Sequence, residues 1–164
     1  MKTNLRHIII KWSYPRKWDC FEDNPLIDSW GIYYITRAIY YDDRTDETPI
    51  YVGKTIRSFR QRFREHEKDE KDFLYKKGEF YVRLGIIEYP NSFATYEKEE
   101  LGVNRLLLTL ESGIITELQN IGYKVQRNLT NVSQISTYTR HYHLEVENIG
   151  YRHYIPSLFN NRNH

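Results

Sequence analysis

The fold of this chain is decided by residues 30–53, which read WGIYYITRAIYYDDRTDETPIYVG. Residues 30–36 and 49–53 are dense in β-branched and aromatic side chains, which favour strands. The polar stretch 42–48 separates them and holds four acids and one arginine. The pattern predicts a β-hairpin with a long acidic connection. Alternation would point Ile50 and Val52 to the core and Tyr51 away from it, with Tyr33 beside Tyr51 if the register matches.

On both sides of this hairpin the sequence predicts further elements. Residues 7–12 (HIIIKW) resemble a short strand, and residues 13–28 are expected to be irregular. Ser58 and Gln61 fit a capping box that opens a helix running to about residue 69. Alternation over residues 80–87 predicts another strand, and apolar spacing over residues 103–119 predicts a second helix that ends at Gly122.

Composition limits the class of protein. The chain has 164 residues, 40% of them apolar and 28% charged, which suits one domain. No apolar run approaches the roughly 20 residues of a membrane helix, so we expect no membrane partner. The first 18 residues lack the apolar stretch of a secretory signal. A single cysteine, Cys20, excludes an intrachain disulfide, and we expect a cytoplasmic protein.

The net charge of +2 conceals an uneven distribution of charge. Residues 54–64 carry five cations and no acid, and the region after residue 123 mixes arginine, histidine and tyrosine. A polyanion would prefer these two stretches. The basic tail could equally be a final strand or hairpin packed on the domain. His141 and His143 do not make a zinc site, because no cysteine or helical HxxxH accompanies them.

Five elements in order resemble the GIY-YIG nuclease family: GIY at 31–33, YVG at 51–53, the R-x-x-x-H pattern of Arg62 and His66, a helical Glu111, and Asn128 after a short strand. The resemblance covers about residues 30–130. It implies an α+β fold, with a small three-stranded antiparallel sheet flanked by helices over residues 29–131. Residues 1–28 and 132–164 would be short extensions, the second of which could contact DNA.

The resemblance also implies an endonuclease that hydrolyses DNA phosphodiester bonds. Tyr33 would be the general base, which requires a phenol pKa well below its ordinary value of about 10. Tyr51 would relay a hydrogen bond, and His66 would take the proton onward. Arg62 would stabilise the transition state with its planar guanidinium. Glu111 would be the single protein ligand of Mg²⁺ or Mn²⁺.

Other positions would have supporting roles. Lys54 could lower the phenol pKa or hold a phosphate, and Asn128 could orient a phosphate or a catalytic group. The cations expected to contact DNA are Lys54, Arg57, Arg60 and Arg64. Each position also has an ordinary structural interpretation: a strand tyrosine, a solvated helix face, a surface histidine, a turn residue, or, for Glu111, a salt bridge within an apolar stripe.

Two other functions remain as alternatives. A non-catalytic nucleic-acid-binding module would need the cations but not a buried glutamate. A protein-interaction domain would leave the acid-free run 54–64 unexplained. Within the nuclease hypothesis, the partner is duplex or branched DNA, and a restriction-type enzyme, a phage or mobile-element nuclease and a structure-specific nuclease all stay open. The oligomeric state, including a homodimer, is open too.

Overall fold

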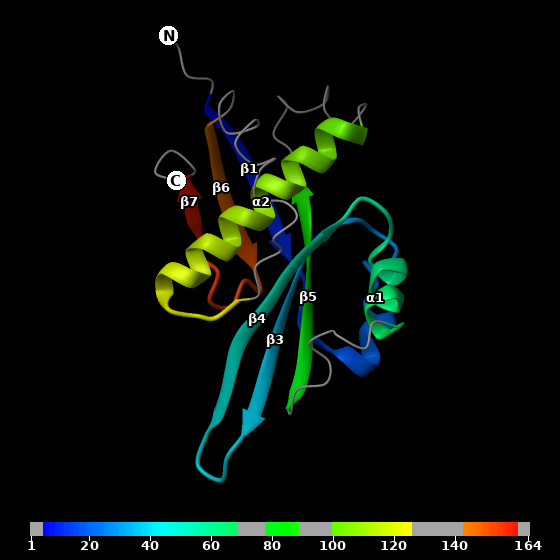
Figure 1. Cartoon of the computed structure of the whole chain (residues 1–164), viewed down its shortest axis with the longest axis vertical. Helices are drawn as coiled ribbons and strands as arrows, with labels where there is room; N and C mark the ends of the chain where they lie inside the picture. The colour runs from blue at the N-terminus through cyan, green and yellow to red at the C-terminus, as the bar shows by residue number, and fades with distance from the viewer. Residues whose placement is uncertain (1–4, 69–77, 89–99, 126–142, 161–164) are drawn as a thin grey trace.

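The protein is built around one mixed, curled β-sheet, seen in a computed structural model that describes residues 5–68, 78–88, 100–125 and 143–160 (Figure 1). The sheet has seven strands in the order β4-β3-β5-β1-β6-β7, and β2 pairs with β5. The strands are β1 (Leu5–Trp12), β2 (Arg16–Lys17), β3 (Gly31–Tyr40), β4 (Thr45–Thr55), β5 (Glu79–Glu88), β6 (His143–Gly150) and β7 (Leu158–Asn160). The helical segments are η1 (Trp18–Asp23), α1 (Phe59–Lys68) and α2 (Glu100–Ile121).

The prediction of a small three-stranded sheet flanked by helices, with short terminal extensions, is wrong. The described structure is predominantly β, and the antiparallel trio β4-β3-β5 is only one part of a larger sheet. Strand β1 pairs antiparallel with β5, where Trp12 lies opposite Gly85, and parallel with β6. Segments from both ends of the sequence therefore complete the sheet, because the isoleucines of β1 need neighbours that bury them.

Several local predictions are confirmed. The strands at 7–12 and 80–87 and both helices are present. The backbone N–H of Gln61 donates to Ser58 Oγ at 3.1 Å, as the capping box requires. Helix α2 ends at Gly122, whose φ of 115° favours glycine, and the N–H of Tyr123 reaches back to the carbonyl of Leu118 at 3.1 Å. For the tail, the structure contains β6, paired with β7, which matches the alternative of a strand or hairpin packed on the domain.

The hairpin connection is shorter than predicted, and residues 13–28 are more ordered than predicted. Strand β4 already begins at Thr45, and the N–H of Tyr41 donates to the carbonyl of Arg44 at 2.8 Å, so the turn spans residues 41–44. Paired strands continue far from the body of the protein, as the long β3–β4 hairpin shows (Figure 1). The segment 13–28, expected to be irregular, contains β2 and η1.

A register shift in the hairpin changes which side chains share a face. Ile35 pairs with Tyr51 and Thr36 pairs with Pro49, so Ile50 is an extra residue in β4. Such a bulge turns the following side chains to the opposite face. Ile50 consequently packs in the same apolar cluster as Tyr51, while Val52 packs in the other cluster. The predicted grouping of Ile50 with Val52, and of Tyr51 away from the core, is wrong.

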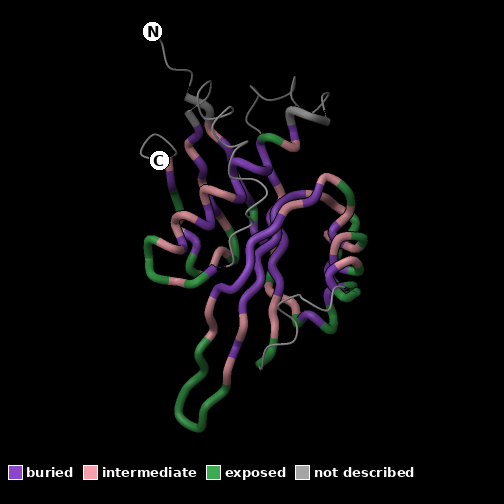
Figure 2. The backbone as a smooth tube through the Cα atoms, viewed as in Figure 1, coloured by how far each residue is buried: buried purple, intermediate pink, exposed green. Residues whose placement is uncertain are grey.

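Both faces of the central strands are buried, as Figure 2 shows for the middle of the sheet. Ile32 and Tyr34 belong to a cluster with the apolar side of α2 and with β1, β6 and β7. Tyr33 and Ile35 face a second cluster with α1 and η1. A strand buried on both faces has no polar face, which explains the nearly continuous apolar run of β3. None of the described helices is long and apolar enough to cross a membrane.

A cluster of polar side chains lies on the face of the sheet covered by α2, at the base of the β3–β4 hairpin. The Arg83 side chain, 6% exposed, donates to Glu47 Oε1 at 3.1 Å, and Thr36 Oγ1 donates to the same oxygen at 2.6 Å. His153 Nε2 lies 3.9 Å from Glu47 Oε2. Burial alone would raise the pKa of Glu47, but the bonds from Thr36 and Arg83 and the nearby His153 hold that pKa below its ordinary value.

We expect Glu47→Gln to lower the free energy of unfolding by about 2 kcal/mol at pH 7, because it leaves the charge of Arg83 buried without a counter-charge. The folded-state pKa of Glu47 is depressed, so its contribution is present above the ordinary glutamate pKa and is lost as pH falls through the folded value. Urea unfolding from neutral to acid pH checks this, and the difference between wild type and variant should shrink toward acid. The control is Asp43→Asn, whose ion pair is 78% exposed on the carboxylate side. An equal loss in both variants would contradict the prediction.

The register of the hairpin also depends on one close contact. Tyr33 lies opposite Gly53, and a Cβ on Gly53 would overlap the phenol ring of Tyr33. We expect Gly53→Ala to lower the free energy of unfolding by about 1–3 kcal/mol, because the new methyl group would displace the buried ring from its stacked position and from its hydrogen bonds. In a Tyr33→Ala background the same substitution should cost much less. A double-mutant cycle by denaturant unfolding measures this coupling, and additive effects would refute the contact.

Candidate active site

The two glycine-containing tripeptides bring Tyr33 and Tyr51 together. Gly31 has a φ of 151°, and a Cβ at this position would overlap the carbonyl of Gly85 on the neighbouring strand. Only glycine suits both demands. The absence of a side chain at Gly53 lets the Tyr33 ring cross β4, where it stacks on Tyr51 with centroids 5.9 Å apart and planes 23° from parallel. Both rings lie on the face covered by α1.

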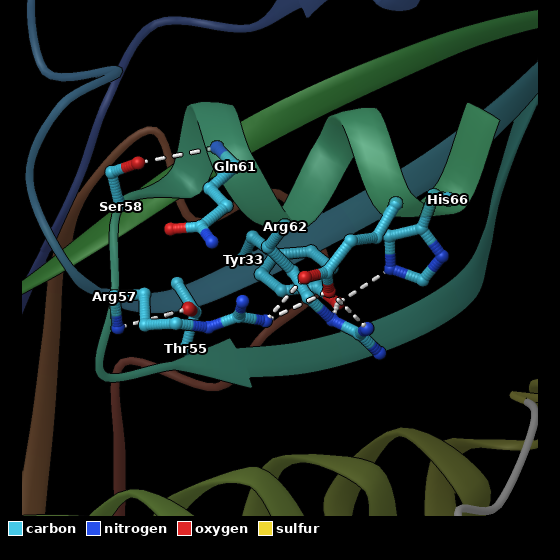
Figure 3. A network of polar contacts seen from close by, with 8 residues as sticks. Tyr33, Thr55, Arg57, Ser58, Gln61, Arg62 and His66 are labelled. Atoms are coloured by element: carbon cyan, nitrogen blue, oxygen red, sulfur yellow. Dashed lines mark hydrogen bonds and ion pairs between the residues drawn. The ribbon is translucent and has the colours of Figure 1, made fainter. Parts of the chain in front are cut away.

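Helix α1 adds the partners of the Tyr33 hydroxyl (Figure 3). The Tyr33 Oη and His66 Nε2 are 2.7 Å apart, and Arg62 Nε donates to the same hydroxyl oxygen at 3.3 Å. Arg62 and His66 lie one turn apart, so both can reach a single atom. Phe59 and Phe63, on the same side of the helix, pack edge-on against the Tyr33 ring. The predicted group of Tyr33, Arg62 and His66 is therefore assembled at one phenol.

A cavity of about 310 Å³ opens at the outer edge of the sheet, beside strand β4. Its wall is formed by β3, β4, the loop that follows, α1 and α2. The lining residues are Tyr33, Tyr51, Gly53, Lys54, Thr55, Ile56, Arg57, Arg62, Asn104 and Glu111. His66 does not line the cavity: it is 5% exposed and lies behind the Tyr33 hydroxyl. The Tyr33 side chain forms part of the cavity wall although it is 0% exposed in the free protein, and the imidazole contacts its hydroxyl from the interior.

Glu111 comes to this cavity from helix α2, on the far side of β4. It is 3% exposed, in line with its position within the apolar stripe of the helix. Lys54 Nζ donates to Asn104 Oδ1 at 2.9 Å, two turns before Glu111 on the same helix. Burial lowers the pKa of Lys54, while the nearby Glu111 carboxylate raises it and Arg62 lowers it. Lys54, Glu111 and Arg62 therefore interact electrostatically across the cavity.

The proton affinity of Tyr33 differs from the sequence-based prediction. Burial raises its pKa well above the ordinary value, and the neighbouring Tyr51 adds to this rise, while Arg62 partly opposes it. The expected low phenol pKa is therefore wrong for the free protein. At neutral pH the phenol is protonated, so its O–H is able to donate to His66 Nε2 while its oxygen accepts from Arg62. This arrangement requires the imidazole tautomer with its proton on Nδ1.

The expected DNA-binding cations are engaged with acids that lie elsewhere in the sequence. Arg60 holds Asp28 through two bonds of 2.8 and 3.3 Å, and Arg64 lies 3.0 Å from Glu22. Arg57 and Arg62 both reach Glu65. The run 54–64 is acid-free along the chain but not in space, so its positive field is weaker than the sequence suggests. Of the four expected cations, Lys54 and Arg57 line the cavity and Arg60 and Arg64 do not.

The residues at the cavity fit one divalent cation. Mg²⁺ and Mn²⁺ prefer oxygen ligands, and Mg²⁺ keeps several waters when few protein groups bind it. Glu111 offers a buried carboxylate on the wall, next to space for water and a phosphate. Within the described ranges no group of three His, Cys, Asp or Glu side chains could hold a metal by itself. A site here would depend on one glutamate and the substrate. Asn128 lies outside the described residues.

Sequence reasoning missed three contributors to the site. Asn104 lies seven residues before Glu111, a spacing that places both on one helix face and could have identified it. Glu65 lies directly before His66 and just after the acid-free run 54–64, and its sequence position did not indicate that it would pair with Arg57. Thr55 accepts a bond of 3.2 Å from the N–H of Arg57 and so fixes the loop that carries this arginine. No pattern in the sequence indicated that last contact.

Comparisons with known proteins add no relative to this picture. No family model matches the chain, and neither the curated proteins nor the solved structures give a match.

Proposed function

We propose that this protein is a divalent-metal-dependent endonuclease of GIY-YIG type that hydrolyses DNA phosphodiester bonds. One observation carries the proposal: Tyr33, Tyr51, Arg62 and Glu111 line a single cavity. They come from two strands and two helices, so residues that are far apart in the sequence meet at one cavity. A purely structural role for each residue gives no reason for their convergence on a cavity.

Tyr33 and His66 provide a path for a proton. A water in the cavity could lose a proton to the Tyr33 oxygen as the phenol proton moves to His66 Nε2, 2.7 Å away. The phenol then never has to be a free phenolate, so its high pKa is no obstacle. A neutral imidazole has one ring nitrogen with a free lone pair, so Nε2 can accept this proton.

Arg62 and Glu111 act on the charge at phosphorus. Arg62 bonds the Tyr33 oxygen through Nε and presents its other nitrogens near the cavity, where a phosphate gains negative charge in the transition state. Glu111 would hold Mg²⁺ or Mn²⁺, which when bound would polarise a phosphate oxygen and help to orient the water. The proposed enzyme acts in the cytoplasm, where its single thiol stays reduced.

The alternative is a DNA-binding module without activity. It is disfavoured because a module of this kind depends on unpaired surface cations. Here Arg60 and Arg64 are paired with Asp28 and Glu22. A binding module would also have no use for the buried Glu111 on the cavity wall.

The decisive experiment incubates the protein with supercoiled plasmid, linear duplex and branched DNA, in Mg²⁺, Mn²⁺ or EDTA, and maps the ends. We expect cleavage in either metal and none in EDTA. The preferred DNA form separates a restriction-type or mobile-element nuclease from a structure-specific one. Binding without cleavage in every metal would favour the binding module.

We expect Glu111→Gln to reduce cleavage to less than a few per cent of wild type while DNA affinity in EDTA stays nearly unchanged. The amide keeps the volume of the carboxylate but is a poor Mg²⁺ ligand. The matched control is Glu117→Gln, on the same helix and outside the cavity. Single-turnover rates and thermal unfolding of both variants check this result. A Glu111→Gln enzyme that cleaves as fast as the control would remove the metal from its proposed place.

Replacing Tyr33 by Phe keeps the ring over Gly53 and removes only the hydroxyl. We expect a loss of about 10²–10⁴ in the single-turnover rate, the usual cost of losing general-base catalysis. Tyr51→Phe, which alters the stacked neighbour, should cost less. If Tyr33→Phe stays within a factor of two of wild type and Tyr51→Phe does not, then Tyr51 carries the role.

A further inference from the structure

Two arginines at the cavity converge on one carboxylate. Arg57, in the loop after β4, lies 2.6 Å through NH2 from Glu65 Oε1, and Arg62 NH1 lies 3.1 Å from Glu65 Oε2. Arg57 NH2 also donates to Oε2 at 2.8 Å, so Arg57 contacts both carboxylate oxygens and Arg62 contacts Oε2. Two cations on one two-oxygen anion is an arrangement that a phosphate can also satisfy, since its non-bridging oxygens accept the same bonds.

Glu65 pairs with these two arginines from outside the cavity. Both Arg57 and Arg62 line the cavity, whereas Glu65 is not among its lining residues. Arg62 uses Nε for the Tyr33 hydroxyl and NH1 for Glu65, so the NH1 bond must be exchanged before a phosphate can take it. The hydrogen bond from Arg57 and then that from Arg62 hold the pKa of Glu65 below its ordinary value, so it is charged at neutral pH.

The exchange is energetically easy. The side chains of Arg57, Arg62 and Glu65 are 47%, 32% and 38% exposed, so solvent screens both pairs. Pairs of this exposure contribute little to stability and break at little cost. A backbone phosphate carries the same single charge as the carboxylate and, unlike it, arrives with neighbouring phosphates that interact with the rest of the surface.

We propose that Arg57 and Arg62 form a binding site for a phosphate of the nucleic-acid backbone, which Glu65 occupies in the free protein as an internal competitor. The inference rests on the proposed function, because it takes the occupant to be a substrate phosphate. Glu65 keeps both guanidinium groups oriented when no substrate is bound. It also lowers the affinity for isolated phosphate groups, which bring no other contacts to offset its displacement.

The test measures binding without chemistry. Affinity for a fluorescein-labelled short duplex is determined by anisotropy in EDTA, and inorganic phosphate is then titrated as a competitor. The variants are Glu65→Gln and Glu67→Gln, two residues apart on the same exposed helix and identical in their change of net charge. We expect Glu65→Gln to bind the duplex at least about fivefold more tightly, and Glu67→Gln to stay within about twofold of wild type.

Two further arms make the result specific. Glu65→Gln combined with Arg57→Ala should lose the gain, because the vacated site then lacks one of its arginines. Inorganic phosphate should compete more strongly against Glu65→Gln than against wild type if the shared chemistry is a single phosphate. A gain for duplex alone assigns the site to the DNA backbone and not to free phosphate.

Equal affinities of Glu65→Gln and Glu67→Gln, or weaker binding by Glu65→Gln with an unchanged circular dichroism spectrum, would overturn the inference and make Glu65 a structural brace. The outcome is separable from that of the nuclease proposal. If wild type never cleaves DNA but Glu65→Gln gains affinity, the phosphate site stands and the chemistry falls. If wild type cleaves and Glu65→Gln gains nothing, the reverse holds.

Discussion

The candidate site depends on the passage of the Tyr33 ring across the bare backbone of Gly53. This contact requires the register in which the two residues lie opposite each other in the hairpin. With the ring in that place, its hydroxyl lies between His66 and Arg62, and the stacked Tyr51 closes the other side. A shift of one residue would move Tyr33 to the opposite face, into the cluster with α2, and would separate its hydroxyl from His66 and Arg62.

The arginines around the site are paired with acidic side chains. The helix that carries Arg62 is held to η1 and the following loop through Arg60 with Asp28 and Arg64 with Glu22. These exposed pairs are worth little individually, and Phe59 and Phe63 anchor α1 in the core. The arginines that look unpaired in the sequence fall into two groups. Arg60 and Arg64 pair with acids outside the cavity, and Arg57 and Arg62 line it.

Much of the local structure was predictable, and the sheet that contains it was not. Strands with strong β-branched content and helices with a cap and a regular apolar stripe are specified by neighbouring residues, as Ser58 and Gln61 show. The pairing of β1 with β6 joins residues about 138 positions apart, as the contact of His7 with Glu145 illustrates. No local pattern encodes such a pairing. The bulge at Ile50 also escaped prediction, because a bulge depends on the partner strand.

The positions of the site residues follow motif spacing and were predictable. The properties that depend on burial were not. Tyr33, Tyr51, Arg62 and Glu111 line one cavity and His66 contacts the Tyr33 hydroxyl, but the phenol pKa moves in the opposite direction from the expected one. Full burial of Tyr33 raises the cost of its phenolate, and the single cation Arg62 does not offset that cost. In the proposed mechanism, base catalysis at Tyr33 therefore requires proton movement to His66 in the same step. The bond from the Arg57 N–H to Thr55 Oγ1 would hold the cationic wall of the cavity in place during that step. The imidazole behind the phenol would then be as necessary to the proposed chemistry as the phenol itself.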